Sequence, residues 1–254
     1  MAVRPHTPPD RFTFDLAYFD HFATGKSTSL GDWLTARTIE QEFRFLSRFL
    51  PTDRHIDLLE IGPGHGELAS RLMAAGYSNY DVVEPNALLR SKLERLGVRS
   101  TKSYLIPDLR ELDASYDAII ICDVFEHLND SREAQRFVSE ARRVLRSGGV
   151  LFILSPDFMD WKEEFYNCDF SHSNPTTVRR THEMFINENL ATAGFMYAYS
   201  CFKGPIGYLL SRLVKVLTFW TIGESLDFKP YKLRLTFLRR FLIVGQKAAS
   251  ARSA

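Results

Sequence analysis

Short apolar runs alternate with amphipathic segments along the middle of this 254-residue chain. Runs that suit buried strands lie at residues 56–61, 80–83, 98–105, 118–122 and 150–154, and apolar positions at helical spacing occur at 68–75, 87–96 and 131–145. Short continuous apolar runs are typical of strands covered on both faces, and strands that alternate with helices pair in parallel. The pattern therefore predicts an α/β fold, with a doubly wound, mostly parallel sheet and helices on both faces.

Glycine and proline mark the expected helix ends. Glycine readily adopts the left-handed conformation that follows many helices, and proline cannot continue one. The ends predicted in this way are Gly148-Gly149 after the helix at 131–145, Gly194 after a helix at 177–193, and Pro51 after a helix at 33–50.

The flanking segments divide the chain into three predicted parts. Residues 1–54 form an N-terminal arm and helical cap, and residues 55–202 form the core. Residues 203–254 form a basic, apolar C-terminal segment whose last strand completes the sheet. A polar, aromatic insert at 157–175 is expected to lie as a lid over the carboxyl ends of the strands.

Composition and charge narrow the class of protein. With 45% hydrophobic and 25% charged residues, the chain is typical of a globular domain. The first residues lack the apolar stretch of a signal peptide, and three widely spaced cysteines favour neither a disulfide framework nor a zinc site, so a cytoplasmic protein is expected. Net charge is +1, but residues 203–254 hold ten Lys or Arg against two acids. This basic end is either a solvated face or one that attracts a phosphate-bearing substrate or an anionic membrane.

A glycine-rich turn joins the first strand to the next helix, in the stretch Asp-Leu-Leu-Glu-Ile-Gly-Pro-Gly-His-Gly-Glu-Leu at 57–68. Such a turn lets a ligand approach the backbone, and the free amides at the start of the helix suit a polar or anionic group. A dinucleotide turn would need a third glycine at the position of Glu67, and a phosphate-binding loop would end in Gly-Lys-Ser/Thr. Neither requirement is met, which disfavours a dehydrogenase and an ATPase.

The motif that does fit is E-x-G-x-G-x-G from Glu60 to Gly66, with Glu84 at the end of the next strand. Two further signals follow in order, Tyr-Asp-Ala-Ile-Ile-Ile-Cys-Asp-Val-Phe-Glu-His-Leu at 116–128 and Ala-Arg-Arg-Val-Leu-Arg-Ser-Gly-Gly at 141–149. Together they resemble the class I S-adenosylmethionine-dependent methyltransferases over residues 58–154. The resemblance implies a Rossmann-like fold, S-adenosylmethionine as cofactor and methyl transfer as the activity.

The resemblance also implies the cofactor-binding residues. Glu60 would receive the methionine ammonium directly or through water, and Glu84 would accept hydrogen bonds from both ribose hydroxyls. Tyr104 and Leu105 would frame the adenine. Cys122 would pack as a small apolar residue and offer its backbone rather than act as a nucleophile. The implied set is Glu60, Gly62, Pro63, Gly64, Gly66, Glu84, Pro85, Leu105, Cys122 and Asp123.

Catalysis is expected in the insert at 157–175. Transfer to an alcohol oxygen needs a base, and the first candidate is His172, with Asp169 orienting it or binding a sugar hydroxyl. The alternative is that His172 only braces the insert. His127, within the Glu-His-Leu of the resemblance, is expected to be structural or a wall of the pocket. No metal is predicted, because the Asp/His pair lacks further clustered ligands.

The acceptor is predicted to be a sugar, a glycan precursor or a related metabolite that is methylated on oxygen. A similar Asp-x-x-His before a helix that ends in Ala-Gly-Phe occurs in methyltransferases of bacterial glycan and secondary-metabolite clusters. A lipid-linked or quinone/phenolic acceptor remains an alternative, as does a non-catalytic cofactor-binding subunit. Nucleic acid is disfavoured because the basic bias is confined to one end and no RNA-binding module accompanies it.

The apolar stretch at 206–222 leaves several interpretations open. It is too short and too charged for a membrane span, because Arg212 and Lys215 interrupt it. Four alternatives remain: the stretch packs in the core, forms a homodimer interface, lies on a membrane as a peripheral helix, or covers a hydrophobic substrate. In the last two cases Lys229, Lys232 and Arg234 would meet a phosphate.

Overall fold

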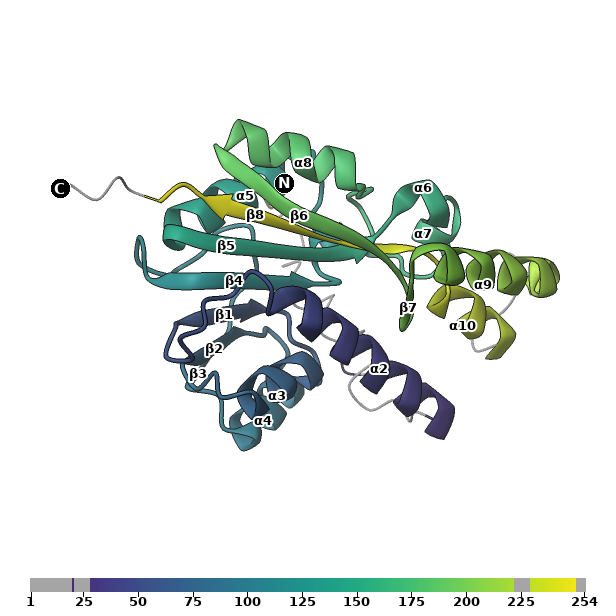
Figure 1. Cartoon of the computed structure of the whole chain (residues 1–254), viewed down its shortest axis with the longest axis horizontal. Coiled ribbons are helices and arrows are strands. Elements are labelled where there is room, and N and C mark those ends of the chain that lie inside the picture. Colours follow the sequence, from purple (N-terminus) through teal and green to yellow (C-terminus); the bar gives the residue numbers. More distant parts are fainter. Residues whose placement is uncertain (1–19, 21–27, 222–228, 250–254) are drawn as a thin grey trace, which may run out of the picture.

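A single twisted sheet runs through the molecule, with helices packed on both faces (Figure 1). The computed structural model describes residues 20, 28–221 and 229–249. Residues 12–22, where aromatic residues at helical spacing predict a short amphipathic helix, lie outside the described residues apart from Asp20. The strands are β1 (Leu58–Ile61), β2 (Tyr80–Val83), β3 (Ser100–Lys102), β4 (Tyr116–Cys122), β5 (Leu145–Pro156), β6 (Leu190–Tyr199), β7 (Phe202–Lys203) and β8 (Arg240–Lys247).

The order of strands across the sheet is β3-β2-β1-β4-β5-β8-β6-β7. The first five pair in parallel, while β8 is antiparallel to both of its neighbours, β5 and β6. The chain therefore returns from its C-terminal region to place β8 inside the sheet. The predicted Rossmann-like, mostly parallel sheet is confirmed, and its order changes direction between β1 and β4, where such folds form their ligand crevice.

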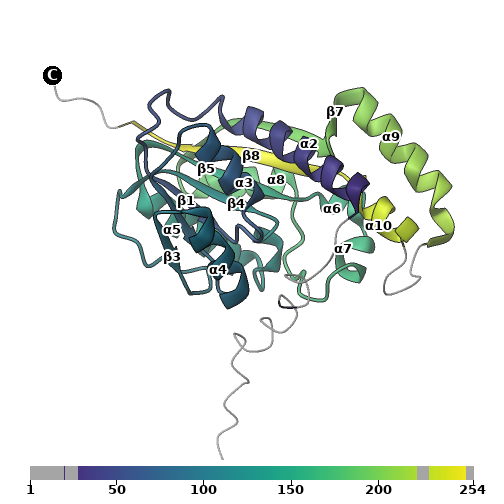
Figure 2. The same ribbon diagram turned by 90° about the horizontal axis from the view of Figure 1, so that it is seen from below.

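Two apolar layers explain why the strands read as continuous hydrophobic runs. The helices are α2 (Ser29–Leu46), α3 (Glu67–Ala74), α4 (Ala87–Leu96), α5 (Ser131–Val144), α6 (Phe158–Trp161), α7 (Glu164–Asn167), α8 (Val178–Asn187), α9 (Gly204–Leu217) and α10 (Lys229–Thr236), with the 3-10 turns η1 (Phe125–His127) and η2 (Phe219–Thr221). Alternate residues of the central strands pack against α2, α3 and α4 on one face and against α5 and α8 on the other. Figure 2 shows α2, α3 and α4 in front of the sheet.

Several predicted helix ends were wrong. The helix predicted at 177–193 ends at Asn187, and β6 already includes Gly194, where a side chain would lie 2.7 Å from the ring of Phe49. Gly148 and Gly149 do not cap α5, since they lie within β5. The helix predicted at 33–50 begins at Ser29 and ends at Leu46. Gly149 and Gly194 leave room for neighbouring atoms in the sheet, whereas Gly148 supplies a backbone φ of 79°. Local sequence does not distinguish these roles from helix capping.

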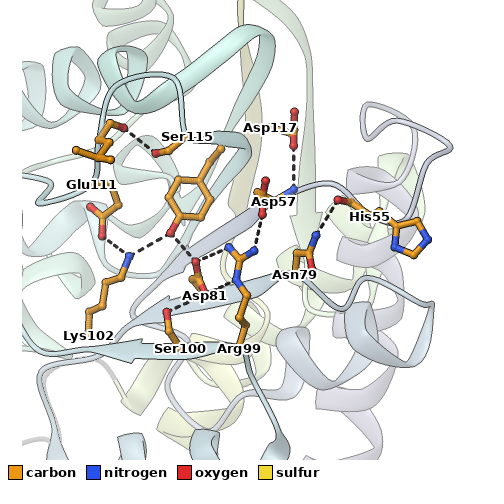
Figure 3. Close-up of polar contacts among 12 residues, drawn as sticks. His55, Asp57, Asn79, Asp81, Arg99, Ser100, Lys102, Glu111, Ser115 and Asp117 are labelled. Atoms are coloured by element: carbon orange, nitrogen blue, oxygen red, sulfur yellow. Dashed lines mark hydrogen bonds and ion pairs between the residues drawn. The ribbon is translucent and has the colours of Figure 1, made fainter.

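A polar network joins the amino ends of β1 to β4, opposite the carboxyl ends where a ligand would bind (Figure 3). The Arg99 guanidinium donates to Asp81 at 2.9 and 2.6 Å and to Asp57 at 2.5 Å, and the Tyr116 hydroxyl donates to Asp81 at 2.6 Å. Burial raises the pKa of Asp81, but hydrogen bonds from Arg99, Tyr116 and Ser100 outweigh it and lower the pKa to about 2. The network therefore stabilises the ionised carboxylate.

We predict that Asp81→Asn lowers the free energy of unfolding by about 2 kcal/mol at pH 7. This loss is smaller than that on removing one partner of a fully buried ion pair, because Arg99 is partly exposed. A carboxyl whose pKa is lowered on folding stabilises the protein above its unfolded pKa. The difference between wild type and variant should therefore shrink as pH falls from about 4 towards 2. Urea denaturation at several pH values measures both effects.

The matched control is Asp108→Asn, because Asp108 pairs with Arg136 on the surface with both side chains more than half exposed. We expect this change to stay within about 0.5 kcal/mol. Equal losses in the two variants would contradict the role given to the network.

Candidate functional site

A cavity of about 820 Å³ opens at the carboxyl ends of β1, β2 and β4. Its walls come from the turn after β1, from α2, from η1, from the insert at 157–175 and from the start of β8. Parallel α/β sheets bind ligands at this edge, where connections from neighbouring strands diverge. Segments far apart in the sequence therefore meet around one volume.

The glycine turn forms the floor of this cavity. Gly62 and Gly64 have φ values of 64° and 57°, and Pro63 lies between them. A Cβ on Gly62 would lie 2.3 Å from Val124, whereas the same position on Gly64 has nothing within 4 Å. The turn is thus packed against the segment after β4 on one side and open to a ligand on the other. Gly66 does not line the cavity: it precedes α3 and packs against Leu93.

Two buried acids face the cavity beside the turn. Glu60 in β1 accepts a hydrogen bond of 2.8 Å from the Tyr80 hydroxyl, and burial raises its pKa to about 8. Glu84 follows β2, accepts the backbone N–H of Asn86 at 2.9 Å, and burial raises its pKa to about 7. Within the described ranges neither carboxyl forms an ion pair with Lys or Arg. A ligand with a positive charge or several hydroxyls would find two strong acceptors here.

Tyr104 and Leu105, the residues predicted to frame the adenine, both line the cavity. Pro85 also lines it, and the Leu105 side chain is partly exposed. The Tyr104 hydroxyl donates to Glu111 at 2.5 Å, which fixes the ring. These residues give this part of the cavity flat, largely apolar walls.

The end of β4 brings together residues that were predicted and residues that were missed. Cys122 and Asp123 line the cavity, and burial raises the pKa of the Cys122 thiol well above its usual value, so this thiol stays protonated. Asp123 pairs with Arg240 of β8, which also lies 3.3 Å from Glu42 of α2. Sequence reasoning missed Glu42 and Arg240. The only signals were that Glu42 is an acid on the apolar side of the helix predicted at 33–50 and that Arg240 is a cation at the start of a strand.

The insert places both predicted catalytic residues at the cavity. His172 Nδ1 lies 2.6 Å from the carbonyl oxygen of Phe165 and 3.7 Å from the thiol of Cys168. Asp169 accepts from the backbone N–H and the hydroxyl of Ser171, at 2.9 and 2.6 Å. The carbonyl of Phe165 therefore orients the His172 ring, a role that was predicted for Asp169.

His127 completes this wall together with Glu126. Its Nδ1 is 2.8 Å from the Ser171 hydroxyl, and its ring centroid is 4.8 Å from that of His172. Glu126 is buried, accepts the Ser155 hydroxyl at 2.8 Å, and its pKa is raised to about 8 by burial. His127 was predicted as structural or a pocket wall, and it does line the cavity. Glu126 and Ser171 were not predicted, because only the fold brings η1 beside the insert.

Comparisons with known proteins identify the family of this chain. A family model described as a methyltransferase domain matches residues 34–198, well over half of the chain. A probable S-adenosylmethionine-dependent methyltransferase of Mycolicibacterium smegmatis is 32% identical over 146 residues, which are 55% of this chain and 51% of that protein. One of Mycobacterium tuberculosis is 30% identical over 172 residues, which are 62% and 56% of the two chains. The chain thus spans about half the length of these curated relatives.

Solved structures share the fold at low identity. A putative sarcosine dimethylglycine methyltransferase from Galdieria sulphuraria superposes with a TM-score of 0.61 at 16% identity, covering 84% of this chain and 85% of that one. A putative methyltransferase from Bacillus halodurans gives 0.58 at 15% identity, covering 82% and 100%.

The donor side of the cavity fits the cofactor of this family. Gly64 leaves the backbone open to a ligand, and the carboxyls of Glu60 and Glu84 offer acceptors for an ammonium group and for ribose hydroxyls. The family resemblance expected from the motifs is confirmed by the match over residues 34–198. The chain therefore belongs to the class I methyltransferases, whose methyl donor is S-adenosylmethionine.

Proposed function

We propose that this protein transfers a methyl group from S-adenosylmethionine to an oxygen of a sugar, a glycan precursor or a related small metabolite. One observation carries the proposal: the cavity that holds the glycine turn and Glu84 also holds His127, His172 and Asp169. Donor and acceptor groups thus share one cavity, as a direct transfer between two bound molecules requires.

The residues of the donor half are proposed to hold the cofactor by its two polar ends. Glu60 takes the methionine ammonium, directly or through water, and Glu84 takes the ribose hydroxyls, with Gly62 and Gly64 letting the ligand approach the backbone. Pro85 and Leu105 contact the adenine. When bound, the cofactor supplies an electrophilic methyl group on a positively charged sulfur.

The acceptor half suits a hydroxyl group. An alcohol must lose its proton near the moment of attack, so a base or an equivalent group has to stand beside it. Because the Nδ1–H of His172 donates to the Phe165 carbonyl, the lone pair of the neutral ring is on Nε2. Asp169 and Ser171 lie on the same wall and offer hydrogen bonds to further hydroxyls, as a sugar would need.

Product formation tests this function. We predict that labelled methyl from S-adenosylmethionine appears in at least one member of a panel of sugar nucleotides, lipid-linked sugars and phenols. His172→Ala should lower the rate by at least about a hundredfold, the usual contribution of a group that handles a proton.

The matched control is His182→Ala, because His182 is exposed on α8 and bonds to Thr192 away from the cavity. It should leave the rate unchanged. An unaltered rate in His172→Ala would remove the catalytic role, and transfer to nitrogen acceptors alone would contradict the proposed chemistry.

A specific observation favours a lipid-linked acceptor as the second candidate. The outward face of α9 and η2 is apolar, with seven side chains at least half exposed: Ile206, Leu209, Leu213, Val216, Leu217, Phe219 and Trp220. Both views show α9 at one end of the molecule, beside α10 (Figures 1 and 2). Contiguous exposed apolar surface of this kind marks contact with a membrane or a partner.

The polar residues of α9 point the other way, into the protein. Arg212 and Lys215 each form an ion pair of 2.7 Å with the buried carboxylate of Asp160. Gly207 and Ser211 are buried on the same side. The ion pairs hold the helix with its apolar face outwards, which contradicts one of the alternatives for this stretch, a helix packed in the core.

Exposed lysines that flank α9 in the sequence favour an anionic membrane as the partner of this face. Lys203, Lys229 and Lys232 are exposed close to α9 in the chain. Arg234, predicted to meet a phosphate with them, is instead buried against Glu164 at 2.9 Å. Among the described helices, none is long and apolar enough to cross a bilayer. We propose that α9 and η2 lie on an anionic membrane surface, where a lipid-linked acceptor would be presented.

Vesicle sedimentation tests this contact. We predict binding to vesicles that contain phosphatidylglycerol, weaker binding to pure phosphatidylcholine, and at least about tenfold weaker binding after the double change Leu209→Glu and Leu213→Glu. The control Leu112→Glu alters an equally apolar but distant residue that is 80% exposed, and should have no effect. The membrane contact would be overturned if the wild-type protein did not bind vesicles. It would also be overturned if the wild type formed a dimer that the double change dissociated.

A further inference from the structure

Three side chains on the acceptor wall form a cluster that the proposed function does not explain. Glu126, His127 and His172 each offer a ligand atom, and these atoms lie within 4.8 Å of one another. Glu126 and His127 belong to η1 after β4, and His172 belongs to the insert after β5. All three line the cavity. From this cluster we propose that the protein binds a divalent transition-metal ion through Glu126, His127 and His172.

The first support is the hydrogen bonding behind both histidines. The Nδ1–H of His172 donates to the Phe165 carbonyl at 2.6 Å. The Ser171 hydroxyl donates its proton to Asp169. The Ser171 oxygen, 2.8 Å from His127 Nδ1, must therefore accept a hydrogen bond from the Nδ1–H of His127. Both rings are therefore held as the tautomer with its lone pair on Nε2. Histidines that bind metals are held by a hydrogen bond to the other ring nitrogen, which the Phe165 carbonyl accepts from His172 and the Ser171 hydroxyl oxygen accepts from His127.

The second support is the burial of Glu126 without a cation. Its side chain is only 1% exposed, and in the part of the chain that the structure describes no Lys or Arg pairs with it. The Ser155 hydroxyl supplies a hydrogen bond but no compensating charge. A buried carboxylate without a cation is unfavourable, and a divalent ion in the cavity would compensate it.

The separations suit an ion after small side-chain rotations. With bonds of about 2.1 Å, two ligand atoms of one ion lie at most about 4.2 Å apart. The ligand atoms of the cluster lie within 4.8 Å of one another, so they would have to approach only slightly. Two imidazoles and one carboxylate favour Mn²⁺, Fe²⁺ or Zn²⁺ over Mg²⁺, which prefers oxygen ligands. Three protein ligands leave the remaining positions for water or acceptor oxygens.

The consequence for chemistry rests on the proposed function. When bound, the ion would lower the pKa of an acceptor hydroxyl beside it, so that the hydroxyl could release its proton to water. The oxygen then forms a bond to the methyl carbon as the carbon–sulfur bond breaks, and the sulfur keeps that electron pair and becomes neutral. His172 thus acts as a ligand rather than as the base itself, and Asp169 and Ser171 position His127.

Calorimetric titration of the metal-free full chain with Mn²⁺ tests the site. We expect one equivalent to bind, with binding at least about tenfold weaker in Glu126→Gln and in His172→Gln and unchanged in the control His182→Gln. Electron paramagnetic resonance of bound Mn²⁺ should show nitrogen hyperfine modulation, which His172→Gln reduces. Circular dichroism checks the fold of each variant. If Glu126→Gln does not fold, the affinity of His172→Gln for Mn²⁺ decides whether the site exists.

The outcomes separate this inference from the proposed function. No saturable binding of Mn²⁺ or Zn²⁺ by wild type, or equal affinity in all variants, overturns the metal site. Methyl transfer that persists in EDTA, by protein that binds neither ion, retains the function and overturns the site. Specific metal binding by protein that methylates no oxygen acceptor supports the site and contradicts the function.

Discussion

The structure depends on how four carboxyl groups are buried around one cavity. Glu42, Glu60, Glu84 and Glu126 are each at most 5% exposed, and burial raises their pKa values to about 7 or 8. Because these values lie above the unfolded value of about 4.5, the acids destabilise the folded protein increasingly as pH rises across that window. Arg240 compensates Glu42 and Asp123. A cationic ligand would compensate the others, so the cavity is suited to bind positive charge.

The fold explains why these acids meet at one edge. Each parallel strand ends on the same side of the sheet, so Glu60 in β1, Glu84 after β2 and Glu126 after β4 approach from separate connections. The polar network of Arg99 and Asp81 joins the same strands at their opposite ends. The contribution of β8 is different. It returns to the middle of the sheet and brings Arg240 beside the end of β4.

Local patterns predicted most of the elements but not their three-dimensional neighbours. The strand at 80–83 and the helix at 87–96 were placed to the residue, since apolar runs, Asn86 and Gly97 specify them locally. Glycines in strands were mistaken for helix caps, because the ring that packs on Gly194 comes from Phe49, far away in the sequence. The three-part division of the chain remains a prediction.

The candidate site shows the same contrast between residues that local motifs predict and residues that only long-range contacts bring together. The donor residues from Glu60 to Glu84 follow from motifs, because the turn is a local structure. The pairing of Glu126 with His172, and that of Arg240 with Asp123, depend on contacts between distant segments. The inward orientation of Arg212 on α9 likewise depends on Asp160, 52 residues away. No periodicity within α9 could show that its charged side faces the protein.

Calorimetry with S-adenosylmethionine tests the central claim, that buried acids at the carboxyl ends of β1 and β2 bind a cationic methyl donor. At pH 7 Glu60 and Glu84 are partly protonated, so binding should release protons, seen as heats that differ between buffers of different ionisation enthalpy. Glu84→Ala should weaken binding at least about tenfold, and the exposed control Glu94→Ala should not. No binding by wild type, or binding that Glu84→Ala leaves unchanged and that releases no protons, would contradict the account.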